Sequence, residues 1–181
     1  MLLKDRGNIA VVTGLGSATY DVAAAGDHAR NYYLWGAMGS SVTVGLGLAL
    51  ARSDLDVVVV TGDGEMLMGL GALATIGVKQ PENLTIVVLD NGYYGETGMQ
   101  VSHAGAGCDM TGVAKACGLA QAITIATKDE LNAAVPLLRQ RGSTRFLRLL
   151  IKADEPPRVM PSRDGVEIKL RFQNAIGAQT A

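Results

Sequence analysis

Two polar side chains that follow apolar runs in this sequence have the chemistry of metal ligands. Asp63 lies between Gly62 and Gly64, directly after the run VVVVTG, and Asn91 follows the next such run, LTIVVLD. If these runs are neighbouring parallel strands, about 5 Å apart, both side-chain oxygens lie at one edge of the sheet. Carboxylate and amide oxygens suit Mg²⁺, which usually keeps water or phosphate oxygens as its other ligands. The spacing therefore predicts a magnesium site formed by Asp63 and Asn91.

The residues around Asp63 favour a diphosphate as the ligand beside this metal. Gly62 and Gly64 allow a phosphate to approach the backbone closely. We expect a helix over Glu65–Val78, whose first N–H groups and positive dipole end would face the same position. The sequence has no Gly-Lys-Ser/Thr phosphate loop and no lysine near these turns, so the metal must neutralise much of the diphosphate charge. Taken alone, the three residues from Gly62 to Gly64 could equally form a β-turn.

The elements that position these residues follow from apolar, β-branched runs that alternate with helical patterns. We expect strands over Asn8–Thr13, Tyr32–Leu34, Asp56–Thr61, Leu84–Leu89, Gln121–Ile125 and Thr144–Ile151, and helices over Ser17–Ala25, Ser40–Arg52, Glu65–Val78, Thr111–Cys117 and Lys128–Arg139. Ser17 or Thr19 should cap the first helix. The Asp56–Thr61 run has no polar alternation, so helices should cover both of its faces. The pattern predicts a doubly wound α/β fold: a mostly parallel sheet in three α/β/α layers, with ligands outside the carboxyl ends of the strands.

Composition narrows the classes of function. The 181 residues suit one folded domain, over residues 1–155, followed by a C-terminal arm at 156–181 that packs on the domain or on a partner. Hydrophobic residues make up 48% and charged residues only 18% of the chain, which predicts burial of part of the surface against another chain, including self-association. The net charge of −1, without a run of Lys or Arg, argues against nucleic acid and membrane partners.

Location and redox state follow from what the sequence lacks. No apolar stretch approaches the roughly 20 residues of a membrane-spanning helix, and the first residues do not form the apolar region of a signal peptide. We therefore expect a cytoplasmic protein. Its two cysteines, Cys108 and Cys117, lack metal-ligand spacing and should be free thiols.

The two histidines are candidate catalytic residues. Histidine titrates near neutral pH, so His28 or His103 could donate a proton to a reaction intermediate. His103 lies in the segment Asn91–Asp109, which is rich in glycine and polar residues and has no clear period. Loops of that length inside a compact domain are usually functional, and we expect this one to be a lid over the site.

The stretch TGDGEMLMGLGALATIGVKQPENLTIVVLDNGYYG resembles the fingerprint of thiamine-diphosphate enzymes, which is Gly-Asp-Gly, a spacer and Asn-Asn. Here Asp90 replaces the first Asn. The resemblance implies that the side chains of Asp63 and Asn91 and the backbone carbonyl of Tyr93 bind Mg²⁺. It also implies that the N–H groups of Gly64 and Glu65 meet the diphosphate. For the side chain of Glu65, we expect only the helix-dipole role of a first-turn acid.

Upstream, LWGAMGSS resembles the turn that holds the pyrimidine ring in the same family. The resemblance implies that Gly36 offers its carbonyl to the amino group of the pyrimidine, and that Met38 lies beneath the cofactor and bends it. The cofactor-binding residues implied by both motifs are Gly36, Ala37, Met38, Gly62, Asp63, Gly64, Glu65, Asn91, Tyr93, Tyr94 and Gly95.

The resemblance covers about residues 30–155, and a weaker likeness in PPRVMP and EIKLRFQNAI points to the small subunit or C-terminal half of sulfopyruvate and phosphonopyruvate decarboxylases. In this family a second, pyrimidine-binding domain supplies a glutamate that activates the cofactor. No segment of the 181 residues is left to form that domain. The resemblance therefore implies the β-type subunit of a lyase that decarboxylates a small 2-oxo acid and is inactive without an α-type partner.

Three alternatives stay open. The chain could belong to a carboligase similar to acetolactate synthase, since the motifs do not decide whether the intermediate is protonated or condensed. It could be the β subunit of a 2-oxoacid oxidoreductase, although two cysteines argue against an iron–sulfur cluster. It could be a non-catalytic nucleotide-binding module, but TGLGSA at 13–18 has only part of the dinucleotide fingerprint, with Thr19 where the third glycine would stand.

Overall fold

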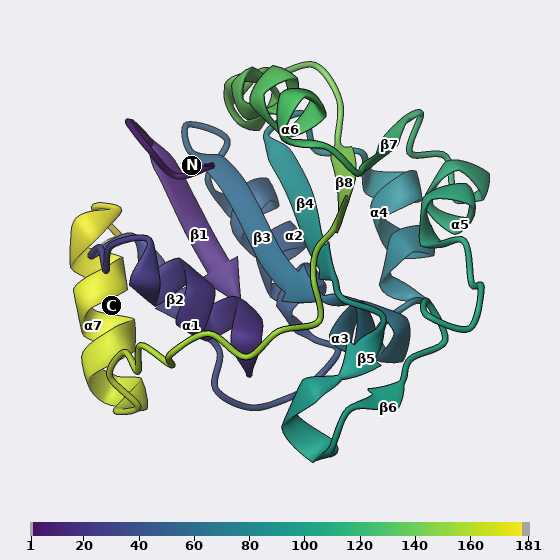
Figure 1. The fold of residues 1–181 in the computed structure, drawn as a ribbon. Coiled ribbons are helices and arrows are strands. Elements are labelled where there is room, and N and C mark those ends of the chain that lie inside the picture. The colour runs from purple at the N-terminus through teal and green to yellow at the C-terminus, as the bar shows by residue number, and fades with distance from the viewer. Residues whose placement is uncertain (1, 179–181) are drawn as a thin grey trace.

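The computed structural model describes residues 2–178, which form a central six-stranded sheet with helices on both faces (Figure 1). The strands are β1 (Ile9–Thr13), β2 (Asn31–Tyr33), β3 (Asp56–Gly62), β4 (Leu84–Asp90), β7 (Gln121–Ile125) and β8 (Arg145–Leu150). Their order is β2-β1-β3-β4-β8-β7, and every pairing is parallel. Strands β5 (Tyr93–Tyr94) and β6 (Gln100–Val101) form a separate antiparallel hairpin. The predicted doubly wound, mostly parallel sheet is confirmed.

The helices lie in two layers. They are α1 (Ser17–Ala24), α2 (Ser41–Ala51), α3 (Asp63–Met68), α4 (Ala72–Lys79), α5 (Met110–Ala116), α6 (Lys128–Ala134) and α7 (Gly165–Ala175), with short 3₁₀ turns η1 (Gly95–Thr97) and η2 (Val135–Arg139). One cluster of buried side chains joins α2, α4 and α5 to the sheet, and a second joins α1 and α6 to its other face. None of the helices within residues 2–178 is long and apolar enough to cross a membrane.

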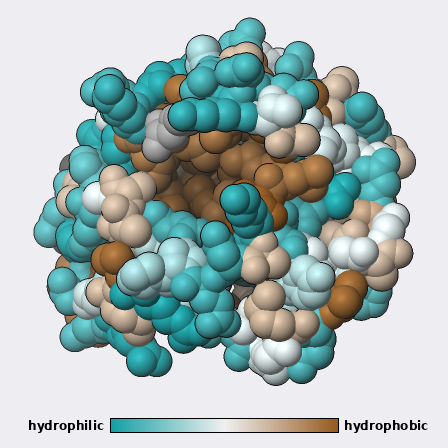
Figure 2. Space-filling model, viewed as in Figure 1, coloured by the Kyte–Doolittle hydropathy of each residue, from teal (hydrophilic) through white to brown (hydrophobic). Residues whose placement is uncertain are grey.

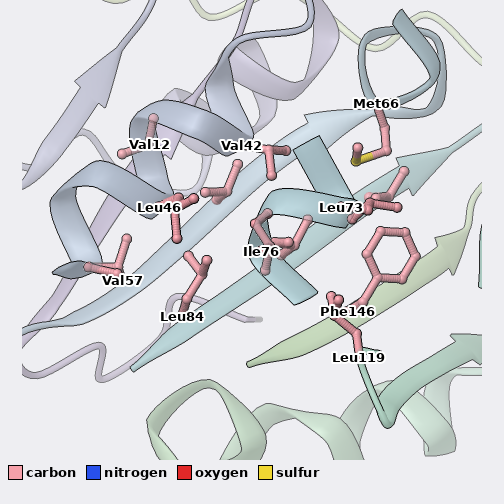
Figure 3. Packing of buried hydrophobic residues seen from close by; sticks show 14 of the residues in the cluster. Val12, Val42, Leu46, Val57, Met66, Leu73, Ile76, Leu84, Leu119 and Phe146 are labelled. Carbon is pink, nitrogen blue, oxygen red and sulfur yellow. The ribbon is translucent and has the colours of Figure 1, made fainter. Parts of the chain in front are cut away.

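The continuous apolar run of β3 is explained by these two layers. Val57 and Val59 belong to one buried cluster, and Val58 and Val60 belong to the other. Figure 3 shows the first cluster, in which side chains of α2 and α4 lie over the central strands. Because the β3–β4 register pairs Gly62 with Leu89, both strands end at the same level. The residues that follow them therefore start side by side.

One face of the sheet keeps an apolar hollow between α1 and α6. Figure 2 shows it as a hydrophobic depression in the view of Figure 1. Its volume is about 280 Å³, and its lining includes Val60, Leu131, Leu149 and Ile151.

The prediction of one helix over Glu65–Val78 is wrong, because the chain forms α3 and α4 with a break at Gly69 to Gly71. The backbone of Gly69 lies against Gly39, so close that a Cβ on Gly69 would be 2.0 Å from the Gly39 carbonyl oxygen. Glycine also lowers helix stability by about 1 kcal/mol relative to alanine. The break lets the turn before α2 pack against the end of α3.

Replacing Gly69 with alanine should lower the free energy of unfolding by about 1–3 kcal/mol, the usual range for overpacking. The added methyl group would meet backbone oxygen, which cannot rotate away. Gly71 is the matched control, since it has φ −60° and no atom within 4 Å of an added Cβ. Gly71→Ala should be neutral or stabilise by roughly 0.4–1 kcal/mol. Urea unfolding checks both variants, and equal losses would contradict the close-contact argument.

Two smaller expectations about helix ends also differ from the structure. Gly16, rather than Ser17 or Thr19, is the N-cap of α1, because the Thr19 hydroxyl donates instead to the Gly14 carbonyl (2.9 Å). The helix expected to reach Arg139 is α-helical only to Ala134 and continues as η2. Pro136 lies in η2, and proline lacks the N–H that an α-helix would need there.

The last helix, α7, packs on β2 of the same chain. The Phe172 ring meets the Tyr32 ring edge to face, with centroids 5.4 Å apart. Arg171 forms a salt bridge to Asp27 at 2.7 Å. The segment between β8 and α7 runs past the carboxyl ends of the strands (Figure 1), where the Trp35 Nε1–H donates to the Ser162 carbonyl (2.7 Å).

Acid should loosen this attachment of α7. Partial burial tends to raise the pKa of Asp27, but hydrogen bonds from Tyr33 and Arg171 outweigh it and hold that pKa below its usual value. A depressed carboxyl pKa stabilises the folded state above the unfolded-state value of about 4, and this contribution is lost as the pH falls through the folded-state value. In Asp27→Asn, the free energy of unfolding should therefore decrease less between neutral and acid pH than it does in the wild type. Urea unfolding at a series of pH values measures this decrease, and an unchanged decrease in Asp27→Asn would contradict the attribution to Asp27.

Candidate functional site

A cleft lies at the carboxyl ends of β1, β3 and β4, as expected for a sheet of this type. Nine of the eleven cofactor residues expected from the sequence line it: Met38, Gly62, Asp63, Gly64, Glu65, Asn91, Tyr93, Tyr94 and Gly95. Gly36 and Ala37 belong to the turn before Met38 and are not among its lining residues. The two halves of the motif thus meet at one cleft, although they lie in separate strand–helix units.

Asp63 is the first residue of α3, and its side chain points into a buried environment with only 2% of the residue exposed. The Ser102 hydroxyl donates a hydrogen bond to Asp63 Oδ2. Burial raises the pKa of Asp63; the hydrogen bond from Ser102 opposes the shift, and the nearby charge of Asp90 adds to it. A carboxylate that is destabilised in this way gains from a bound cation.

Asn91 lies in a tight turn that directly follows β4. Its Oδ1 accepts the Tyr93 N–H (2.9 Å), and the Asp90 Oδ1 accepts the Gly92 N–H (3.0 Å). Gly92 has φ +76°, a left-handed conformation that glycine adopts without strain. The turn therefore holds the Asn91 side chain at the end of the strand next to Asp63.

Asp90 stands where the thiamine-diphosphate fingerprint has its first Asn, and the structure shows what accompanies the change. Arg148 of β8 donates from Nε to Asp90 Oδ2 at 2.6 Å, and its Nη1 lies 3.9 Å from Asp109 Oδ1. Asp90 and Arg148 are both largely buried, with 4% of the Asp90 side chain and 15% of the Arg148 side chain exposed. The guanidinium group neutralises the extra carboxylate beneath the Asn91 turn.

The expectation that the Glu65 side chain only complements the helix dipole does not account for where the structure places it. The residue is 5% exposed, and neither carboxylate oxygen has a hydrogen-bond partner among the described residues. Its carboxylate lies over the α-carbon of Gly14, where a Cβ would be 1.7 Å from Oε2. The side chain is thus folded inward, against the turn that follows β1.

That turn is a part of the site that the sequence reasoning missed. Leu15, Gly16, Ser17 and Ala18 line the cleft beside Gly64 and Glu65. In the sequence, these residues stood out only as an incomplete dinucleotide fingerprint. The signal that identifies them is the sheet order, which places β1 next to β3 and brings both of the following turns to one edge.

The two histidines occupy different places. The His103 Nδ1 lies 3.3 Å from the Tyr94 hydroxyl, and the Tyr94 ring covers Gly64, whose Cβ would be 2.4 Å from Tyr94 Cε1. His28 instead precedes β2 at the amino-terminal edge of the sheet, where its Nδ1 accepts the Arg30 N–H (3.0 Å). His28 is thus at the opposite end of the strands from the cleft and is not among its lining residues, so the structure does not bring it together with the other predicted site residues.

The side chains in the cleft fit a metal-bound diphosphate. A diphosphate alone would meet the carboxylates of Asp63 and Glu65, so a cation is needed between them. Within residues 2–178, no three His, Cys, Asp or Glu side chains are grouped to hold a metal by themselves. A cation here would therefore complete its shell with oxygens from Asn91, a backbone carbonyl and the ligand, as Mg²⁺ does with phosphates.

Comparison with known proteins gives several relatives. The chain is 36% identical over 168 residues to the sulfopyruvate decarboxylase subunit beta of Methanococcus maripaludis, covering 92% of this chain and 88% of that one. It is 41% identical over 109 residues to the subunit of the same name from Methanocaldococcus jannaschii, covering 60% of this chain and 57% of that one. It is 37% identical over 169 residues to the phosphonopyruvate decarboxylase of Streptomyces viridochromogenes, covering 91% of this chain and 41% of that protein.

A solved structure shows the same fold. The benzoylformate decarboxylase from Polynucleobacter necessarius superimposes with a TM-score of 0.71 at 20% identity, over 86% of this chain and 33% of that one. Residues 13–148 also match the family model described as the thiamine pyrophosphate enzyme, C-terminal TPP binding domain. That range contains the turn after β1, the Gly-Asp-Gly turn and the Asn91 turn. This chain therefore belongs to the family of C-terminal, thiamine-pyrophosphate-binding domains of thiamine pyrophosphate enzymes.

Proposed function

We propose that this chain is the β-type subunit of a thiamine-diphosphate- and Mg²⁺-dependent lyase that decarboxylates a small 2-oxo acid, of the sulfopyruvate or phosphonopyruvate kind. The observation that carries the proposal is the meeting of Asp63 and Asn91 in one cleft, within a domain of this family. The relatives named for these two substrates support the substrate class. Thiamine diphosphate supplies the electron sink for cleavage of the bond between the carboxylate and the 2-oxo carbon.

The residues of this chain would bind and orient that cofactor. The Asp63 and Asn91 side chains and the Tyr93 carbonyl would hold Mg²⁺, and the N–H groups of Gly64 and Glu65 would meet the diphosphate. In the turn before α2, the Gly36 carbonyl would face the pyrimidine and Met38 would lie beneath the rings. The position of Met38 in the lining of the cleft supports this arrangement.

A proton must be delivered if the product is an aldehyde, and His103 is the candidate donor. Its contact with the Tyr94 hydroxyl places it one side chain away from the cleft, since Tyr94 is a lining residue. His103 is on the segment that follows the β5–β6 hairpin, so it would act from the lid side of the site.

The activating glutamate would come from a separate, pyrimidine-binding subunit. The Methanococcus maripaludis relative, of which the alignment covers 88%, carries the name of a beta subunit, which supports a two-subunit enzyme. We propose that the two chains form a hetero-oligomer with the cofactor between them, and that this chain alone has no decarboxylase activity.

The test combines binding with turnover. Thiamine diphosphate and Mg²⁺ are titrated calorimetrically into this chain, alone and with a candidate α-type subunit, and release of CO₂ is then measured with sulfopyruvate, phosphonopyruvate and pyruvate. Metal-dependent binding that tightens with the partner, followed by CO₂ release from one of the anionic 2-oxo acids, is the expected result. Binding without turnover by any combination would remove the decarboxylase assignment, and absence of binding would remove the cofactor assignment as well.

A further inference from the structure

One buried serine touches both halves of the site. Ser102 follows the β5–β6 hairpin and is fully buried. Its hydroxyl donates to Asp63 Oδ2, although the two residues are 39 positions apart. Its backbone N–H donates to the Gly92 carbonyl at 2.8 Å, one residue beyond Asn91. We propose that Ser102 is the positioning residue of the metal site, which fixes the two side chains that would bind Mg²⁺; this inference rests on the proposed function.

The hydroxyl of Ser102 controls the orientation of the Asp63 carboxylate. The Gly105 N–H donates to Ser102 Oγ at 3.2 Å, so the oxygen is held from one side and its hydrogen is directed toward Asp63. The bond occupies Oδ2 and leaves Oδ1 as the oxygen for a metal. Outer hydrogen bonds of this kind set the direction of a ligand and limit its rotation.

The backbone of Ser102 controls the Asn91 turn. Its N–H fixes the Gly92 carbonyl, while the Gly92 N–H is bound to Asp90 Oδ1. Gly105 also packs on this carbonyl, since a Cβ on Gly105 would lie 2.4 Å from the Gly92 oxygen. The peptide groups on both sides of Gly92 are therefore held by hydrogen bonds, and Asn91 cannot turn away from the cleft without breaking the bond from the Ser102 N–H.

A substitution can remove the Ser102 hydroxyl and keep the backbone hydrogen bond to Gly92. In Ser102→Ala, the Mg²⁺ concentration that half-saturates thiamine diphosphate binding should rise roughly 10–100-fold, the usual range for an outer partner of a metal ligand. In Ser102→Thr, which keeps the hydroxyl, the wild-type Mg²⁺ dependence should be largely restored. The readout is calorimetric binding with Mg²⁺ and thiamine diphosphate as probes, so it does not depend on turnover.

The matched control is Thr144→Ala, which removes another buried hydroxyl far from the cleft. The Thr144 hydroxyl donates to the Pro81 carbonyl at 2.7 Å, at the amino-terminal edge of the sheet. This variant should lose stability without a change in Mg²⁺ dependence. A wild-type Mg²⁺ dependence in Ser102→Ala overturns the positioning role and leaves the proposed function intact. Wild-type protein that binds thiamine diphosphate without any need for Mg²⁺ overturns both.

Discussion

Asp63→Ala should abolish Mg²⁺-dependent binding of thiamine diphosphate, with a loss of affinity beyond the roughly 100-fold that marks the upper range for outer partners of metal ligands. The side chain is the only carboxylate of the Gly-Asp-Gly turn, and it is held beneath the cleft by Ser102. Without it, the charge of a diphosphate would face the buried carboxylate of Glu65 with one fewer group to hold the cation between them.

The same change should leave the metal-free protein at least as stable as the wild type. The pKa of Asp63 is raised, chiefly by burial, so above that pKa the charged carboxylate opposes folding. Removing the group removes this penalty. Lost binding with retained stability is the pattern expected of a residue kept for function.

Calorimetry and urea unfolding on one pair of variants separate these effects. The control is Asp54→Ala, which removes a carboxylate with 61% of its side chain exposed, where it pairs with Arg52 before β3. Asp54→Ala should bind thiamine diphosphate as the wild type does. If Asp63→Ala retains metal-dependent binding, or if both variants lose it equally, Asp63 is not the metal ligand.

Arg148→Met should lower the free energy of unfolding by about 3–5 kcal/mol, the range for removing one partner of a buried ion pair. The Asp90 carboxylate would lose its 2.6 Å contact with the guanidinium while only 4% of its side chain is exposed. Its remaining bond to the Gly92 N–H does not neutralise the charge. The Asn91 turn should lose rigidity at the same time.

The double variant Asp90→Asn/Arg148→Met should recover most of this loss, because it replaces the ion pair by the amide that the family fingerprint has at this position. Urea unfolding of the two single variants and the double variant gives the coupling free energy between the residues. If the losses of unfolding free energy in the two single variants simply add in the double variant, Asp90 and Arg148 are not coupled. The replacement of Asn by Asp at position 90 would then be unexplained.

Much of the site was predictable from residues close together in the sequence. The strand ends before Asp63 and Asn91, and the glycines around Asp63, are signals that lie within a few residues of one another. A buried parallel strand shows as an uninterrupted apolar run because both faces are covered, and β3 does so through Val57 to Val60. The convergence of the two motif halves then follows from the geometry of neighbouring parallel strands.

The parts that were missed depend on contacts between distant residues. The break between α3 and α4 follows from the approach of Gly69 to Gly39, and no pattern inside Glu65–Val78 records where Gly39 will be. The glycines at this break were a weak signal, because one glycine in a helix costs only about 1 kcal/mol. The helical spacing of apolar residues also continues across the break.

The sequence by itself marked the candidate metal ligands, because residue type and position after a strand suffice to single out Asp63 and Asn91. Only the tertiary structure decided what holds them. Ser102 reaches Asp63 across 39 positions and Arg148 reaches Asp90 across 58. The turn after β1 joins the site only because β1 lies next to β3. These choices depend on the order of the strands in the sheet and on how the segment after β6 packs against them, and such long-range contacts are settled by packing the whole chain rather than by local preference.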